Sequence, residues 1–195
     1  MEFVVASHNR KKIGEMDAIL GALGISFLPL PQGAPEPEED GATFEENALI
    51  KARAACAFTG KPAVADDSGL CVDALGGAPG IYSARYCEGS DSDRNAFLLE
   101  NLAAVPDGGR QAQFVSAIAC VFPGGEALVV RGECAGEIVR SPQGEGGFGY
   151  DPLFYVAEYG CTFAQLPAEV KNRISHRARA LQKMKQALGE YYAEQ

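Results

Sequence analysis

Short apolar runs and helical spacing follow one another at the start of the chain. Residues 3–6 form a continuous apolar run typical of a buried strand. Apolar residues then recur at intervals of three and four from Ile13 to Leu23, which predicts a helix that ends at Gly24. Residues 25–30 predict a second strand. A strand, a helix and a further strand in this order indicate the α/β class.

Three more helices are expected further along the chain. Thr43 and Glu46 have the T-x-x-E form of a capping box, which predicts a helix running to about Gly60. Residues 95–104 carry apolar side chains at helical intervals. Ser175 can cap a last helix, in which the apolar residues share one face.

The remaining apolar runs predict strands. Residues 64–66 are expected to end a third strand. Residues 114–122 and 127–130 are separated by a Pro-Gly-Gly turn, which is typical of a hairpin. Residues 153–156 resemble another strand, and the chain shows no repeat or linker. We therefore expect one α/β domain over residues 1–195, long enough to bury a substantial core.

Composition and charge narrow the possible partners. The net charge of −9 disfavours non-specific binding to nucleic acid or to an anionic membrane. No apolar run reaches membrane length, and the first residues do not resemble a signal peptide, so a cytoplasmic location is expected. The six cysteines are scattered without a C-x-x-C pair, and with only two histidines they favour neither a zinc site nor a disulfide framework.

A basic segment lies between the first strand and the first helix. Residues 7–12 read SHNRKK, at the carboxyl end of a strand where open α/β sheets bind ligands. Free N–H groups at a helix start favour an anion, and the lysines add positive charge. Alone, the segment is equally consistent with a solvated basic turn.

Two acidic segments are candidates for holding a metal ion. Asp66 and Asp67 are adjacent at the expected strand end, and carboxylate oxygens are ligands that suit Mg²⁺. A simple Asp-Asp-Ser-Gly turn is an equally good reading of this pair. Glu38 and Glu39, in a proline-rich loop, and Lys51, on the second expected helix, are unremarkable by themselves.

The segment GGFGYDP at 146–152 could receive a nucleobase. Phe148 offers a flat face for stacking and Asp151 a hydrogen-bond acceptor, although a hydrophobic turn is the simpler reading. Lys171, His176 and Arg177 supply donors near another helix start. Together with the basic segment and the aspartate pair, these residues indicate a site for a nucleotide and a metal ion.

Five blocks of the sequence, taken in order, resemble one family. They are SHNRKK, TFEENALIKA, PAVADDSGLCVDALGGAPGIYSARY, GGFGYDPLF and ISHRARAL. The chain resembles the non-canonical purine nucleoside triphosphate pyrophosphatases, the inosine triphosphate pyrophosphatase family. The resemblance implies an elongated mixed central β-sheet flanked by helices, two lobes with a cleft between them, and a homodimer. It also implies Mg²⁺-dependent hydrolysis of ITP, dITP and XTP to the monophosphate and pyrophosphate.

The resemblance assigns roles residue by residue. Asp67 is expected to be the catalytic residue and a metal ligand, with Asp66 and either Glu39 or Glu38 as further acidic groups. The expected substrate-binding residues are Ser7, His8, Asn9, Arg10, Lys11, Lys12, Lys51, Ser68, Phe148, Gly149, Tyr150, Asp151, Lys171, His176 and Arg177. Of these, Phe148 should stack on the purine. His8 stands where many members have a small residue.

The expected reaction is attack of water on the α-phosphorus, with pyrophosphate leaving. Selectivity should come from the oxygen at position six of the purine, met by Arg177 or a backbone N–H, because adenine would leave such a donor unpaired. Two alternatives remain: a Maf-type pyrophosphatase acting on other nucleotides, and a purine nucleotide-binding protein without catalysis.

Overall fold

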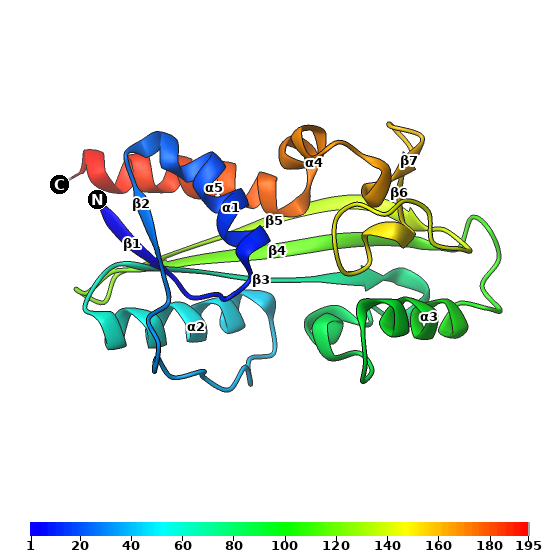
Figure 1. The fold of residues 1–195 in the computed structure, drawn as a ribbon, viewed down its shortest axis with the longest axis horizontal. Coiled ribbons are helices and arrows are strands. Elements are labelled where there is room, and N and C mark those ends of the chain that lie inside the picture. The colour runs from blue at the N-terminus through cyan, green and yellow to red at the C-terminus, as the bar shows by residue number, and fades with distance from the viewer. Residues whose placement is uncertain (195) are drawn as a thin grey trace. The chain divides into compact units, whose positions relative to one another are not determined.

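The structure, a computed structural model, describes residues 1–194 and contains two compact units (Figure 1). Unit 1 comprises Met1–Asp67, Ser116–Gly132 and the segment from His176 onward. Unit 2 comprises Ser68–Val115 and Glu133–Ser175. Each unit is therefore assembled from segments far apart in the sequence.

Seven strands within the described residues form one mixed sheet in the order β2-β1-β3-β4-β5-β6-β7. They are β1 (Glu2–Val5), β2 (Ser26–Pro29), β3 (Ala63–Val72), β4 (Gln111–Val121), β5 (Ala127–Ile138), β6 (Phe154–Val156) and β7 (Cys161–Thr162). Strand β1 is parallel to β2 and β3, whereas β6 is antiparallel to β5 and β7. The α/β class and the mixed sheet are confirmed, and β4 and β5 are neighbours as the hairpin prediction requires.

The helices are α1 (Arg10–Leu20), α2 (Phe44–Thr59), α3 (Asp91–Asn101), α4 (Ala168–Ile174) and α5 (His176–Ala193). Helix α1 begins three residues before the first apolar position, because the Asn9 side chain accepts hydrogen bonds from the N–H groups of Lys11 and Lys12. Helix α3 likewise begins early, at a capping box made by Ser90 and Asp93. The short elements α4 and β7 were not predicted.

Unit 1 has its own core, in which α1 and α5 pack against the strands. Helix α2 lies on the other side of these strands (Figure 1). Phe3, Ile118 and Met184 are fully buried there. Strand β5 and α5 approach very closely at Gly132, where an added Cβ would lie 2.2 Å from the carbonyl oxygen of His176. Only glycine fits this position.

Unit 2 buries a separate apolar cluster that includes Leu70, Leu98 and Phe154. Helix α3 lies on one side of its strands and α4 on the other (Figure 1). Among the described residues, no helix is long and apolar enough to cross a membrane. All six cysteines are free thiols.

Candidate active site

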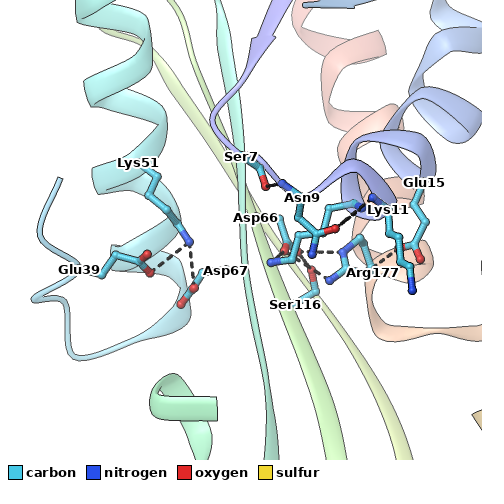
Figure 2. A network of polar contacts seen from close by, with 11 residues as sticks. Ser7, Asn9, Lys11, Glu15, Glu39, Lys51, Asp66, Asp67, Ser116 and Arg177 are labelled. Carbon is cyan, nitrogen blue, oxygen red and sulfur yellow. Dashed lines mark hydrogen bonds and ion pairs between the residues drawn. The ribbon is translucent and has the colours of Figure 1, made fainter. Parts of the chain in front are cut away.

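Strand β3 places the aspartate pair differently from the sequence prediction. Asp66 and Asp67 lie inside a ten-residue strand, Ala63–Val72, rather than at its end. Two adjacent carboxylates followed by Ser-Gly have the composition of a turn, but partners distant in sequence stabilise them within the sheet. Because successive side chains of a strand point to opposite faces, Asp66 contacts α1 and α5 while Asp67 contacts α2 (Figure 2).

Asp66 is the centre of a buried polar network. Its carboxylate lies 2.6 Å from Lys12 Nζ and 3.4 Å from Arg177 Nε, and it accepts a hydrogen bond from the Ser116 hydroxyl. Arg177 also donates to Glu15, at 2.7 Å (Figure 2). Burial alone would raise the pKa of Asp66, but the charges of Arg177 and Lys12 hold this pKa well below its usual range. Asp66 is therefore a fixed negative charge that holds two cations in place.

On the opposite face of β3, Asp67 shares an ammonium group with Glu39. Lys51 Nζ lies 3.0 Å from Asp67 Oδ1 and 3.1 Å from Glu39 Oε2 (Figure 2). Burial raises the pKa of Asp67, although Lys51 opposes this shift. The second carboxylate oxygen, Asp67 Oδ2, is buried and has no hydrogen-bond donor among the described residues.

The loop before α2 determines which glutamate reaches this position. Glu39 is half-buried against Lys51, whereas Glu38 is exposed. The loop is held by the backbone N–H of Gly41, which donates to the side chain of the fully buried Asn47 at 2.9 Å. A Cβ at Gly41 would lie 2.6 Å from that Asn47 oxygen, so glycine lets the loop approach closely.

The predicted capping box forms only in part. Thr43 accepts a hydrogen bond from the Glu46 N–H at 3.1 Å, as expected. The Glu46 carboxylate instead accepts from the N–H of Ala42 at 2.7 Å, one residue before the cap. This contact ties down the same loop that carries Glu39.

The predicted phosphate-binding segment turns into α1 at Asn9. The hydroxyl of Ser7 accepts a hydrogen bond from the Asn9 N–H at 3.1 Å. Arg10 and Lys11 are exposed in the first helical turn. His8 is exposed as well, with Nε2 3.7 Å from a carboxylate oxygen of Glu36.

A cavity of about 360 Å³ in unit 1 brings these groups together. The predicted residues that line it are Ser7, His8, Lys12, Glu39, Lys51 and Asp66. The basic segment, Glu39 and Asp66, separated in sequence by tens of residues, thus face one space, whereas Asp67 is not among the lining residues. A cavity with cations on one side and carboxylates beside them can hold polyphosphate oxygens and a metal ion.

The carboxylates bound to Lys51, at the edge of this cavity, suit Mg²⁺. Magnesium is usually held by one or two carboxylates together with substrate phosphates and water. Glu39 lines the cavity, and Asp67 is joined to it through the shared ammonium of Lys51. The Oδ2 atom of Asp67 is a buried oxygen that has no donor among the described residues. Within residues 1–194 no group of three or more His, Cys, Asp or Glu side chains converges to hold a metal ion.

The predicted base-binding segment lies in unit 2. The carboxylate of Asp151 accepts hydrogen bonds from the Phe148 N–H at 3.0 Å and from Lys171 Nζ at 2.6 Å. Lys171 Nζ also lies 4.7 Å from the centre of the Phe148 ring. Tyr150 is buried and donates to the carbonyl of Ser83 at 2.7 Å. These contacts bring Phe148, Asp151 and Lys171 together, and the binding of a base by this segment stays a prediction.

Other predicted site residues are less distinctive, and two partners were missed. Ser68 follows Asp67 in β3 and is half-buried, and His176 is buried at the first position of α5. Glu15 and Ser116, which complete the Asp66 network, were not predicted. Glu15 lies one turn from Lys12 on α1, so helical spacing gives it a weak signal, whereas nothing local marks Ser116.

Comparisons with known proteins show which sequences and folds this chain resembles. Residues 3–187 match the model of the Ham1 family. The chain is 53% identical over 178 residues, 91% of its length and 90% of the relative's, to a dITP/XTP pyrophosphatase of Symbiobacterium thermophilum. It is 54% identical to the dITP/XTP pyrophosphatase of Geobacter sulfurreducens over 95% of this chain and 96% of that protein. A solved structure of a HAM1 protein from Coxiella burnetii has a TM-score of 0.90 and 45% identity, covering 97% of this chain and 99% of that chain.

Proposed function

The chain belongs to the Ham1 family, and on that basis we propose how its residues perform the family's reaction. The protein is a nucleoside triphosphate pyrophosphatase that hydrolyses non-canonical purine nucleoside triphosphates to the monophosphate and pyrophosphate. The observation that carries the detailed proposal is the cavity in which Ser7 and Lys12 face the same space as Glu39 and Lys51. The family match extends through both units, so we propose one catalytic domain over residues 1–195.

The phosphates bind in the cavity of unit 1. Lys12 and Lys51 supply positive charge, and the Ser7 hydroxyl supplies a hydrogen-bond donor. His8, exposed at the edge of the cavity, can donate a further hydrogen bond to phosphate. Arg10 and Lys11 in the same helical turn contribute charge without burial.

Asp67 and Glu39 are the residues that would hold Mg²⁺. When bound, the ion neutralises phosphate charge and polarises the phosphoryl group that water attacks. Of the other acidic residues that the sequence suggested, Glu38 is exposed and Asp66 is engaged by Lys12 and Arg177. We therefore propose that Asp66 fixes these two cations and that Asp67, with its buried acceptor oxygen, orients the attacking water and accepts its proton.

Unit 2 carries the purine-binding residues. We propose that Phe148 stacks on the base and that Gly149, Tyr150 and Asp151 complete this wall, with Lys171 held by Asp151. The family resemblance assigns Ser68 to the edge of the substrate. It assigns Lys171 of unit 2, with His176 and Arg177 of unit 1, to the base and sugar side. A donor facing the six-oxo group would be left unpaired by adenine, which gives selectivity against ATP.

Steady-state pyrophosphate release from ITP, dITP and XTP in the presence of Mg²⁺, measured beside ATP and GTP, tests the function. We expect turnover of ITP, dITP and XTP and little turnover of ATP and GTP. Cleavage of pyrimidine triphosphates instead would favour a Maf-type activity, and nucleotide binding without pyrophosphate release would favour a non-catalytic binding protein. Omitting Mg²⁺ should abolish turnover, and another divalent ion that restores it better would overturn the assignment of the metal.

Replacing Asp67 by asparagine tests its role directly. The variant should retain nucleotide binding but lose turnover by about 10²–10⁴, the usual contribution of a positioned general base. Glu38→Gln is the matched control, because this carboxylate is exposed and should be dispensable. Activity in Asp67→Asn close to that of the parent would remove Asp67 from the proposed role.

We also propose a cytoplasmic homodimer, as the resemblance implies. Six free cysteines are suited to a reducing compartment, where the nucleotide pool lies. Light scattering coupled to size-exclusion chromatography will give the mass in solution, and a value near the 20.6 kDa of one chain would contradict the dimer.

A further inference from the structure

The loop that carries Phe148 is held by the first turns of α3, a helix that no sequence motif connected with the site. The Gly149 N–H donates to Asp91 Oδ2 at 2.8 Å, and the Gly149 carbonyl accepts from Asn95 Nδ2 at 3.2 Å. Both hydrogen-bonding groups of one residue are therefore bound by one helix. That residue directly follows Phe148, the proposed purine-stacking ring.

The backbone at this point requires such support. Gly149 has φ of +61°, a left-handed conformation that glycine adopts readily. Glycine also loses more conformational freedom on folding than other residues, so fixing it in one conformation is costly. Asn95 lies on the same face of α3 as Asp91, one turn later, and is 5% exposed. Its second polar atom, Oδ1, is buried and has no hydrogen-bond partner within the described residues. Burying an amide oxygen without a hydrogen-bond partner is costly. The hydrogen bond that the Asn95 side chain does make is to the carbonyl of Gly149 in the loop.

We propose that Asp91 and Asn95 are positioning residues that hold the Phe148 loop in the conformation that receives the purine. This inference rests on the proposed function, in which Phe148 stacks on the base. Asp91 and Asn95 touch the loop backbone, so their removal should weaken purine binding and leave the chemistry at the phosphates nearly unchanged. A separate contact, from Tyr150 to the carbonyl of Ser83, holds the far side of the same loop and stays intact.

A tryptophan introduced in place of Phe148 gives a direct readout. The chain contains no tryptophan, so in a Phe148→Trp protein all tryptophan fluorescence reports on this loop. Phe148 is half-buried, so part of the residue is open to solvent and to a ligand. Titration with IMP, the product nucleotide, measures stacking through fluorescence quenching without hydrolysis.

In this background, Asp91→Ala should raise the Kd for IMP about tenfold, since hydrogen bonds to a charged acceptor are the stronger ones. Asn95→Ala should raise it about threefold to fivefold, because a neutral hydrogen bond is weaker. Asp91→Asn keeps an acceptor oxygen and should restore most of the affinity. Activity is measured in the protein that keeps Phe148, with ITP as substrate. There, Asp91→Ala and Asn95→Ala should raise KM while kcat changes less than about threefold. This pattern is expected when an interaction that stabilises the bound substrate and the transition state equally is lost.

Asp93→Ala is the matched control. Within residues 1–194, Asp93 closes the capping box with Ser90 at the same end of α3 and forms no hydrogen bond with Gly149. It should lower the melting temperature as much as Asp91→Ala and leave the Kd unchanged. Hydrogen exchange of the segment 144–151 in the ligand-free protein should be faster in Asp91→Ala than in Asp93→Ala.

The possible results separate this inference from the proposed function. Two results would overturn the positioning role alone. In the first, IMP quenches the fluorescence and its Kd is unchanged in Asp91→Ala and Asn95→Ala. In the second, Asp93→Ala loses as much affinity for IMP as Asp91→Ala does. If IMP fails to quench the fluorescence of the Phe148→Trp protein itself, then the stacking role of this position fails, and the positioning role fails with it. Equal hydrogen exchange in Asp91→Ala and Asp93→Ala would show that Asp91 does not hold the loop.

Discussion

Replacing Asp66 by asparagine should destabilise the protein strongly, although the side chain keeps its size. The carboxylate is 3% exposed and is bound by Lys12, Arg177 and Ser116. Removing one partner of a buried ion pair costs about 3–5 kcal/mol because the opposite charge is left uncompensated. Glu15 still pairs with Arg177 in the variant, so we expect the lower end of this range, about 3 kcal/mol.

Urea unfolding followed by circular dichroism at pH 7 measures this cost. With a slope of about 1–3 kcal/mol/M, a loss of about 3 kcal/mol lowers the midpoint by about 1–3 M. Asp107→Asn is the control, because the Asp107 side chain is 84% exposed and its pairing with Arg140 should contribute little. A midpoint for Asp66→Asn equal to that of the control would refute the reasoning.

The pH dependence of this difference gives an independent check. The folded state holds the pKa of Asp66 well below its usual range, through Arg177 and Lys12 against the effect of burial. In the unfolded chain this carboxyl takes up a proton near pH 3.9. The stability that Asp66 contributes is therefore fully present above that pH and is lost as the pH falls toward the folded pKa. The gap between parent and Asp66→Asn should narrow in acid, and a gap that stays constant down to about pH 3 would contradict the assigned cause.

Unit 1 gives two further predictions. Lys51→Met should lower kcat for ITP by about 10²–10³ in a steady-state assay, because it removes the cation shared by Asp67 and Glu39. Full activity of this variant would show that the Lys51 charge does not act on the phosphates. Gly132→Ala should lower the free energy of unfolding in urea by about 3 kcal/mol or more, since its Cβ would collide with the backbone of α5. Gly14 is exposed in α1 and has space for a Cβ, so Gly14→Ala should raise this free energy by about 0.5–1 kcal/mol. Similar effects of the two substitutions would exclude the close packing of β5 against α5.

The sequence predicted most strands and helices because their apolar spacing is local. It misplaced Asp66 and Asp67 at a strand end, since two carboxylates inside a strand are favourable only when buried cations compensate them. Those cations come from residues such as Arg177, which is 111 positions away from Asp66 in the chain. No local pattern reports such a pairing.

The candidate site could be predicted where residue type alone suggests chemistry. The cavity contains Lys12 and Glu39, both of which the sequence singled out, and it distinguishes Glu39 from Glu38 by burial. Asp91 and Asn95 could not be predicted, because their role is to bind backbone groups of a loop more than 50 residues away. Such contacts depend on tertiary structure and leave no mark on apolar periodicity.

The use of α5 in the core of unit 1 affects how the protein can fold during its synthesis. Glu15 and Arg177, which bind each other, are 162 positions apart. While a ribosome is still translating the intervening segments, β1 and α1 have already emerged and lack the helix that covers them. Unit 1 can therefore close only after α5 leaves the exit tunnel, and until then its apolar strands are exposed to chaperones and proteases. We expect nascent chains arrested before residue 176 to be protease-sensitive in this unit, and chains arrested after α5 has emerged to be protected.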